Sequence, residues 1–479
     1  MRLQTSQNST HVGNVEIHEL FRVSELDAGH SVQTNELKTG SNGLANHTTH
    51  RTNIPFSRES LHAVESRIAI IIPCMDEEQH ILEVVLHGIP HDCLIVIVSN
   101  SKPFNFQAEC SLLAEFCANA ERPGIAVHQK DEDLAQAFYV AGLPEIVLEA
   151  APCPQDQKGI LRIRSGKGEA MMIGIAIAKL AGKQFVGFID ADNLVSGAVN
   201  EYCKVYAAGL HYALHYTGTV DPHAMVRIKW NSKPKVRDNE LIFEKSGRSS
   251  RVVNEWMNRL LNTLVDGTNQ NDIMQTANAG EHAMSLDLAL ELKLANGYAV
   301  EPSQLINAWQ QFGQRLCTHD VEELRTAIST CRDAGDEESN TQASNSAPPS
   351  MSTSTPHSRR SSISTPSTPA ETRKVHVLQI ETRNPHFHDC SKGDGHIERM
   401  QAQGLSIIYN SALTPETLKE ELRTYMKENL SGVVDINGEP QRMRVYPPMG
   451  QMNFEMFREV VKEKDILKVV GETGDKALF

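Results

Sequence analysis

Two aspartates separated by one residue follow an apolar run near the middle of the chain. The run is Gln184–Asn193, QFVGFIDADN, and the acids are Asp190 and Asp192. Buried strands of parallel sheets have this composition, and ligands of such sheets bind at the carboxyl ends of the strands. Two carboxylates there suit a divalent cation that holds a diphosphate. The alternative is a strand and a turn whose aspartates cap the next helix.

A glycine-rich turn precedes this strand. It reads SGKGE from Ser165 to Glu169 and leads into a helical pattern. Glycines let the backbone approach an anion, the first turn of a helix offers free N–H groups, and Lys167 adds a positive charge. The spacing of a P-loop is absent. The turn therefore predicts an anion site, with a plain loop as the alternative.

Two further polar segments could contribute to the same site. PCMDEE, Pro73–Glu78, follows the first strong strand, where acids bind the ribose or base of nucleotides or act as charges at a helix start. NAGEHA, Asn278–Ala283, combines small residues with an amide, an acid and an imidazole. It predicts either a polar pocket lining or the capped start of a helix.

Two histidines follow the last strong strand, in ETRNPHFHD. His386 and His388 point to the same side if this segment is extended. One of them could join Asp192 on a metal, although a lone histidine could equally be structural. Carboxylate oxygens with one imidazole suit magnesium or manganese, and zinc is a third candidate.

Strands that alternate with helices must position these groups. This order predicts an α/β fold with a mostly parallel central sheet. We expect strands at 14–20, 67–73, 94–99, 160–164, 184–190, 225–230 and 375–382, and helices at 77–87, 107–118, 134–142, 198–208, 251–264, 283–294 and 416–426.

Charge and cysteine content limit the function. A net charge of −14 over 479 residues argues against general binding of nucleic acid or anionic membranes. Eight basic residues nevertheless lie between Met225 and Arg251, as a solvated face or as a site for phosphate or carboxylate groups. Nine cysteines without a C-x-x-C pair favour reduced thiols and a cytoplasmic location. No apolar run is long enough to span a membrane, and the first residues lack the apolar core of a signal peptide.

One segment differs from the rest in composition. About two-thirds of residues 339–372 are Ser, Thr or Pro, which predicts disorder. We expect one large domain formed by residues 1–332 and 374–479, interrupted by an insertion at 333–373. The sequence RRSS at 359–362 could be phosphorylated or could be a charged patch in a solvated loop.

Taken together and in order, these segments resemble the mannosyl-3-phosphoglycerate synthase family of retaining GT-A-type glycosyltransferases. The resemblance extends along nearly the whole chain. It includes the blocks HVGNVEIHEL, IAIIIPCMDEE, LIVIVSNS, GKGEAMMIG, FVGFIDADN, TANAGEHAMS, GYAVEPSQL and QIETRNPHFHD.

The resemblance implies transfer of mannose from GDP-mannose to the C2 hydroxyl of 3-phosphoglycerate for mannosylglycerate biosynthesis, with no nucleic-acid or membrane partner and a homodimer as the candidate assembly. It implies that Asp192 binds the metal with His386, which we favour, or His388. The implied catalytic residues are Asp190, Asp192 and Lys167. The implied donor-site residues are Pro73, Asp76, Glu77, Ser99, Lys167, Gly168, Asp190, Ala191 and Asp192, and those of the acceptor site are Arg227, Lys229, Asn278, Ala279, Gly280, Glu281 and His282.

Two departures bear on this interpretation. Family members commonly have Lys-Asn where this chain has Met75-Asp76, which leaves the donor preference open. The Ser/Thr/Pro insertion is absent from compact relatives. The alternatives are a glucosyl-3-phosphoglycerate synthase that uses another sugar nucleotide, and a non-catalytic sugar-nucleotide-binding regulator.

Overall fold

Four parallel strands rich in β-branched residues form one half of the central sheet. In the computed structural model, β6 (Ile68–Cys74) pairs with β7 (Leu94–Ser99) on one side and with β11 (Phe185–Phe188) on the other. The strand β8 (Gly124–His128) lies beyond β7. Since the four strands are parallel, their carboxyl ends meet at one edge of the sheet.

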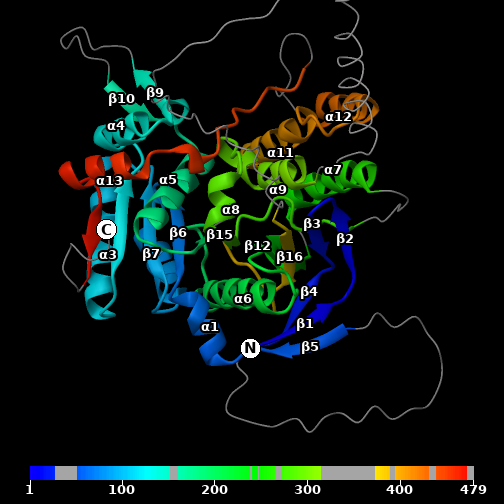
Figure 1. The fold of residues 1–479 in the computed structure, drawn as a ribbon, viewed down its shortest axis with the longest axis horizontal. Coiled ribbons are helices and arrows are strands. Elements are labelled where there is room, and N and C mark those ends of the chain that lie inside the picture. Colours follow the sequence, from blue (N-terminus) through cyan, green and yellow to red (C-terminus); the bar gives the residue numbers. More distant parts are fainter. Residues whose placement is uncertain are drawn as a thin grey trace, which may run out of the picture. The chain divides into compact units, whose positions relative to one another are not determined.

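Helices cover both faces of this sheet. Successive side chains of β6 belong to separate apolar clusters: Ile70 packs with α6 and the helices next to it, and Ile71 packs with α5. The first face carries α1 (Arg58–Glu65), α2 (Gln79–Gly88), α3 (Pro103–Asn119) and α6 (Ser196–His215), and the second carries α5 (Lys167–Leu180) and α8 (Leu286–Glu291). The predicted α/β class, with a large central sheet between helices, is confirmed (Figure 1). The sheet as a whole is mixed and not mostly parallel, because β15 and the outer strands pair antiparallel with their neighbours.

An unpredicted strand joins the two halves of the sheet. We expected a helix over residues 283–294, but His282–Ser285 form β15, and α8 begins only at Leu286. β15 lies antiparallel between β11 and β12 (His223–Lys229). The prediction was wrong because this short segment has no strong strand signal of its own, and the pairing partners on both sides decide its conformation.

The other half of the sheet combines distant parts of the chain. β16 (Val375–Glu381) runs parallel to β12, and its other side pairs with β3 (Val15–His18) and β4 (Phe21–Glu25). The remaining N-terminal strands are β1 (Arg2–Ser6), β2 (Ser9–Val12) and β5 (Arg51–Pro55). Thirteen strands of the described residues form this sheet.

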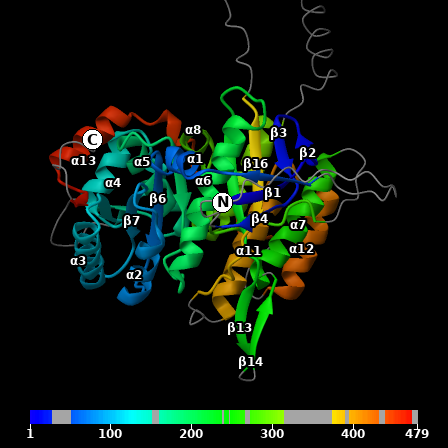
Figure 2. The same cartoon turned by 90° about the horizontal axis from the view of Figure 1, so that it is seen from below.

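The remaining elements flank this core. A hairpin, β13 (Lys233–Arg237) with β14 (Glu240–Glu244), projects from the body (Figure 2). No helix among the described residues is long and apolar enough to cross a membrane. The other elements are α4 (Glu132–Val140), η1 (Pro144–Ile146), β9 (Val147–Ala150), β10 (Ile160–Ile163), α7 (Arg248–Leu264), η2 (Gly297–Ala299), α9 (Val300–Phe312), α11 (Asp394–Tyr409), α12 (Glu416–Asn429), η3 (Met449–Gln451), α13 (Phe454–Glu463) and β17 (Lys468–Val470).

The structure describes residues 1–26, 51–150, 160–237, 240–245, 247–265, 272–313, 373–388, 394–430 and 439–471. Met1–Gly313 and Arg373–Phe479 belong to one compact unit. The predicted insertion and the RRSS motif lie outside the described residues, so the boundaries at 332 and 374 stay predictions.

Candidate active site

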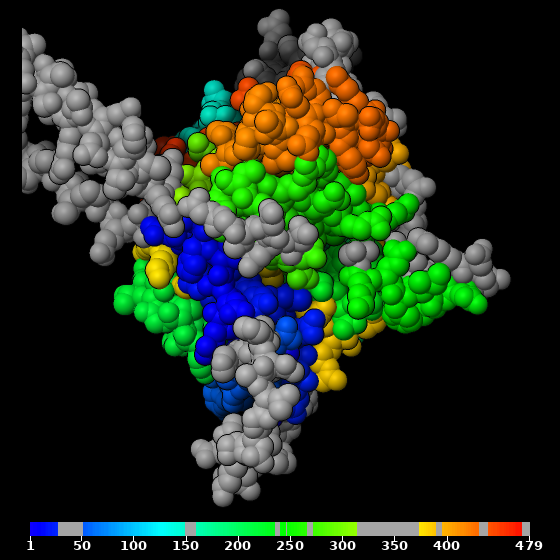
Figure 3. Space-filling model, turned by 90° about the vertical axis from the view of Figure 1, so that its right-hand side faces the viewer, coloured from blue at the N-terminus to red at the C-terminus, as the bar shows by residue number. Residues whose placement is uncertain are grey.

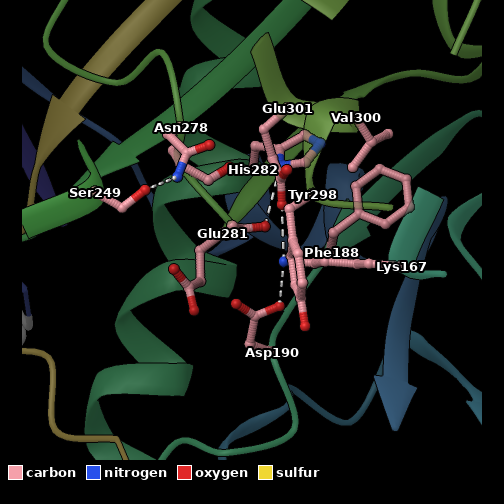
Figure 4. A network of polar contacts seen from close by, with 12 residues as sticks. Lys167, Phe188, Asp190, Ser249, Asn278, Glu281, His282, Tyr298, Val300 and Glu301 are labelled. Atoms are coloured by element: carbon pink, nitrogen blue, oxygen red, sulfur yellow. Dashed lines mark hydrogen bonds and ion pairs between the residues drawn. The ribbon is translucent and has the colours of Figure 1, made fainter. Parts of the chain in front are cut away.

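A buried lysine lies between two carboxylates at the carboxyl edge of the sheet. Lys167 Nζ is 2.5 Å from Asp190 Oδ1 and 2.9 Å from Glu301 Oε1 (Figure 4). The three side chains come from the start of α5, the end of β11 and the first turn of α9. Burial disfavours the ammonium form, but the two carboxylates outweigh it and hold the pKa of Lys167 well above its usual value. Lys167 is therefore a fixed cation that orients Asp190, and not a base.

Gly280 packs directly against this ion pair. A Cβ at this position would lie 2.5 Å from Asp190 Oδ2 and 3.1 Å from Lys167 Nζ. Only glycine fits here without displacing the charged groups. Gly168 is different: a Cβ there would collide with the carbonyl oxygen of Ala295, so this glycine serves close packing of α5 against a neighbouring segment.

Glu281 adds a further carboxylate behind the aspartates. Its oxygens accept hydrogen bonds from Trp230 Nε1, at 3.0 Å, and Asn193 Nδ2, at 3.4 Å. Burial, followed by the neighbouring Asp190, raises the pKa of Glu281 to about 8. Three carboxyl groups, Asp190, Asp192 and Glu281, thus interact in one region.

The histidine segment pairs with the residues that follow Asp192. Asn193 and His388 form an antiparallel bridge, and Leu194 N donates to Phe387 O at 3.0 Å. This pairing brings the histidines, which are almost two hundred residues away in sequence, to the aspartates.

The two histidines have different surroundings. His386 is 3% exposed, its Nδ1 lies 3.0 Å from the Tyr202 hydroxyl, and its ring stacks on Trp230 with centroids 4.0 Å apart. Burial lowers the pKa of His386 well below its usual value. His388 is partly exposed and lies directly opposite Asn193.

The donor set suits a divalent cation. An imidazole and a carboxylate from neighbouring backbone segments could serve as ligands. A cation would also offset the burial and the nearby Asp190 charge that raise the pKa of Glu281. Asp192 and one histidine of the segment are the residues that fit this role.

The segment after β6 forms a tight turn. Asp76 has a φ of 56°, and its Oδ1 accepts hydrogen bonds from Lys102 N at 2.9 Å and Asn105 Nδ2 at 2.7 Å. Asparagine also tolerates this left-handed conformation and offers the same acceptor. An asparagine at position 76, as the resemblance implies for relatives, would therefore fit this backbone equally well, while Met75 is exposed.

The other predicted donor residues differ in accessibility. Pro73 and Glu77 are half-buried at the carboxyl end of β6, and Ala191 is buried between the two aspartates. Ser99 is fully buried, and its Oγ accepts a hydrogen bond from Ser101 N. The structure thus contradicts a direct donor contact for Ser99, which instead shapes the turn after β7.

A cavity of about 700 Å³ lies on the other side of the Asn278–Gly280 turn. Asn278 and Ala279 line it, and Asn278 Oδ1 is buried without a hydrogen-bond partner among the described residues. The turn therefore borders the ion pair on one side and the cavity on the other. The charged residues lining the cavity are Lys229, Lys245, Arg251, Arg259, Glu255 and Asp272.

Two residues assigned to the acceptor, Arg227 and His282, do not line this cavity. Arg227 is 0% exposed and donates to the carbonyl oxygens of Thr276, Ala277 and Glu301 and to Gln304 Oε1. Burial lowers its pKa to about 10. Its donors are occupied, so the expectation that Arg227 contacts the acceptor is wrong, and it supports the turn instead.

His282 and Lys229 also have structural partners. His282 is fully buried, with Nδ1 3.1 Å from the carbonyl oxygens of Ala279 and Gly280 and Nε2 3.0 Å from Gln304 Nε2. It fixes the turn and does not face the cavity. Lys229 lines the cavity, but its Nζ pairs with Glu381 Oε1 at 2.8 Å.

Sequence reasoning missed two important residues, Glu301 and Trp230. Glu301 lies within GYAVEPSQL and is 2% exposed. An acid among small and apolar residues at the start of a helix was the available signal, because buried acids require a partner. Trp230 donates a hydrogen bond to Glu281 and stacks on His386. No local sequence pattern predicts these two contacts.

Comparisons with known proteins agree with the residue pattern. The family model "Mannosyl-3-phosphoglycerate synthase (osmo_MPGsynth)" matches residues 5–461. The chain is 33% identical to mannosyl-3-phosphoglycerate synthase of Pyrococcus furiosus over 453 residues, 94% of both chains. It is 27% identical to that of Aeropyrum pernix over 416 residues, 86% of this chain and 89% of the relative.

A solved structure with partial similarity is glucosyl-3-phosphoglycerate synthase from Mycobacterium tuberculosis in complex with Mn²⁺, uridine diphosphate and phosphoglyceric acid. It has a TM-score of 0.44 and 15% identity, over 83% of this chain and 95% of that chain. The family match and the full-length relatives confirm the resemblance inferred from the motifs. The chain belongs to the mannosyl-3-phosphoglycerate synthase family.

Proposed function

We propose that this protein transfers mannose from GDP-mannose to the C2 hydroxyl of 3-phosphoglycerate with retention of the anomeric configuration. The observation that carries this proposal is the Asn278–Gly280 turn, which borders the Lys167–Asp190 ion pair on one side and a cavity containing basic residues on the other. A charged donor and a charged acceptor could meet across this turn. The full-length relatives named mannosyl-3-phosphoglycerate synthase support the same reaction.

The donor diphosphate would bind at the carboxyl edge with a divalent metal, Mg²⁺ or Mn²⁺, with Zn²⁺ as a third candidate. Asp192 and His388 would hold the metal, because His388 is partly exposed and paired with Asn193, whereas His386 is buried against Tyr202 and Trp230. When bound, the metal would stabilise the charge that develops on the departing diphosphate. Lys167 would keep Asp190 oriented toward the donor.

The acceptor would bind in the cavity. Its phosphate and carboxylate groups require cations, and Lys245, Arg251 and Arg259 line the cavity. Arg259 already pairs with Glu421 and stacks on Trp256, so Arg251 and Lys245 are the better candidates. The buried Oδ1 of Asn278 would accept a hydrogen bond from an acceptor hydroxyl.

We favour a front-face mechanism. The bond between mannose C1 and the diphosphate oxygen breaks, the bond from C1 to the acceptor O2 forms on the same face, and the departing diphosphate takes the hydroxyl proton. Trapping a mannosyl-enzyme adduct by mass spectrometry would contradict this mechanism.

The donor preference distinguishes the proposed mannosyltransferase from the nearest alternative, a glucosyl-3-phosphoglycerate synthase. The purified chain would receive 3-phosphoglycerate with GDP-mannose, GDP-glucose or UDP-glucose in separate reactions, and the product would be measured by mass spectrometry. We expect phosphorylated hexosylglycerate chiefly from GDP-mannose. Preferential use of a glucose donor would identify a glucosyl-3-phosphoglycerate synthase instead.

The same experiment tests a non-catalytic role. Binding of GDP-mannose without release of GDP in the presence of any phosphoglycerate would favour a sugar-nucleotide-binding regulator. The ordered Lys167–Asp190–Glu301 arrangement favours catalysis, because Lys167 and Glu301 are largely removed from solvent and buried charges are costly to keep without a function. A cytoplasmic location and a homodimer remain part of the proposal.

A further inference from the structure

A second group of metal-ligating side chains lies at the opposite end of β16 from the candidate active site. Glu16 and His18 are two residues apart on β3 and share one face, and His376 of β16 stands directly opposite Glu16 in the parallel register. These three form the one group of at least three such ligands within mutual reach among the described residues. His18 and His376 are 6% and 1% exposed.

The ligand atoms have the spacing of a metal site. His18 Nε2 is 3.1 Å from His376 Nδ1, and the Glu16 carboxylate oxygens lie 3.5 Å from His376 Nδ1 and 3.9 Å from His18 Nε2. Ligands about 2.1 Å from a tetrahedral zinc ion are about 3.4 Å apart. The observed separations lie on either side of that value, so small side-chain movements would bring all three atoms onto one ion.

The residues around the cluster also fit a metal site. His376 Nε2 lies 3.0 Å from Thr219 Oγ1, so the ring nitrogen that would not bind the metal already has a partner, as in most histidine metal sites. His11 on β2 stands opposite Glu16 in the antiparallel register and is exposed. It is the natural fourth ligand, since a rotation of its side chain is not hindered by burial.

We propose that Glu16, His18 and His376 form a second metal site, selective for Zn²⁺ or a similar transition metal, with His11 or water as the fourth ligand. Two imidazoles and one carboxylate favour zinc over magnesium, which prefers oxygen ligands. The site is separate from the catalytic edge, because roughly 16 Å of strand separates His376 from Glu381 at about 3.3 Å per residue. An ion here would tie β3 to β16 across segments distant in the chain. Figure 3 shows N-terminal residues, in blue, at the surface of the molecule.

The test measures Zn²⁺ binding to the full chain with the active-site metal site weakened. The starting protein is the Asp192→Ala variant, and Co²⁺ absorption serves as a second readout of tetrahedral coordination. We expect one tightly bound Zn²⁺ that Mg²⁺ in excess does not displace. Adding Glu16→Gln, which keeps the size of this partly exposed side chain, should weaken Zn²⁺ binding at least tenfold, and Thr219→Val should weaken it by roughly tenfold.

The matched control is His62→Gln in the same background. His62 Nδ1 also lies close to an acid, 2.8 Å from Asp92 Oδ2, but outside any such three-ligand group. Zn²⁺ binding should be unchanged in this variant. The proposal is overturned if the Asp192→Ala protein binds no Zn²⁺, or if Glu16→Gln and His62→Gln have equal affinity; the cluster is then only a hydrogen-bonded histidine pair.

Discussion

Histidines and acidic side chains lie near both ends of β16, but different structural features position them at each end. At its start, His376 meets Glu16 and His18 through regular strand pairing. Beyond its end, His386 and His388 reach the aspartates through an irregular segment that pairs with Asn193 and Leu194. At the start, strand register alone fixes the geometry. At the other end, turns, the buried Arg227 and the close approach of Gly280 to the ion pair fix it.

The largest effect should come from removing Asp192, the proposed metal ligand at the proposed catalytic end. Asp192→Ala should lower the transfer rate by roughly 10³-fold, because charge on the departing diphosphate is no longer stabilised. The fold should remain intact, since Asp192 lies in the turn after β11. Steady-state kinetics and circular dichroism measure the two properties. A rate within tenfold of wild type would refute the metal assignment.

A second substitution tests the contact between Gly280 and the Lys167–Asp190 ion pair. Gly280→Ala should lower the transfer rate by roughly 10²-fold, because its Cβ would displace Asp190 and Lys167, and small displacements of catalytic groups are costly. Gly197→Ala is the control, because a Cβ there meets nothing within 4 Å. Equal activities of the two variants would show that the turn has no positioning role.

A third substitution addresses the cavity. Arg251→Gln should raise the KM for 3-phosphoglycerate roughly tenfold and leave the KM for GDP-mannose nearly unchanged, because it removes a charged hydrogen bond to the acceptor. Arg248→Gln, in the same helix but not among the cavity-lining residues, is the control. A rise in both KM values for Arg251→Gln would place this residue outside the acceptor site.

The smallest effect on transfer should come from the start of β16. His376→Gln should change kcat/KM less than about twofold in assays with saturating Mg²⁺, because the cluster lies roughly 16 Å along the strand from the catalytic edge. Zn²⁺ should raise the melting temperature of the wild-type protein but not that of the His376→Gln variant. A tenfold loss of transfer would show that the two ends are coupled.

The α/β fold around the proposed catalytic end was predictable because its sequence signals are local. FVGFIDADN shows an apolar strand and its terminal acids within ten residues, and the glycine-rich turn before α5 is equally compact. The Glu16–His18–His376 cluster was not predictable, because it depends on the register between strands whose histidines are 358 residues apart in the chain. Arg227 was misassigned because its place in a basic run does not reveal that four acceptors surround it. The choice between His386 and His388 likewise depends on packing against Tyr202 and Trp230.

The most direct test of the account is the identity and stereochemistry of the product. The wild-type chain would be incubated with GDP-mannose, 3-phosphoglycerate and Mg²⁺, and the product would be followed by nuclear magnetic resonance. We predict mannosyl-3-phosphoglycerate linked at O2 with the anomeric configuration of the donor, and loss of the product when the metal is chelated. An inverted product, or only free mannose and GDP, would contradict the account.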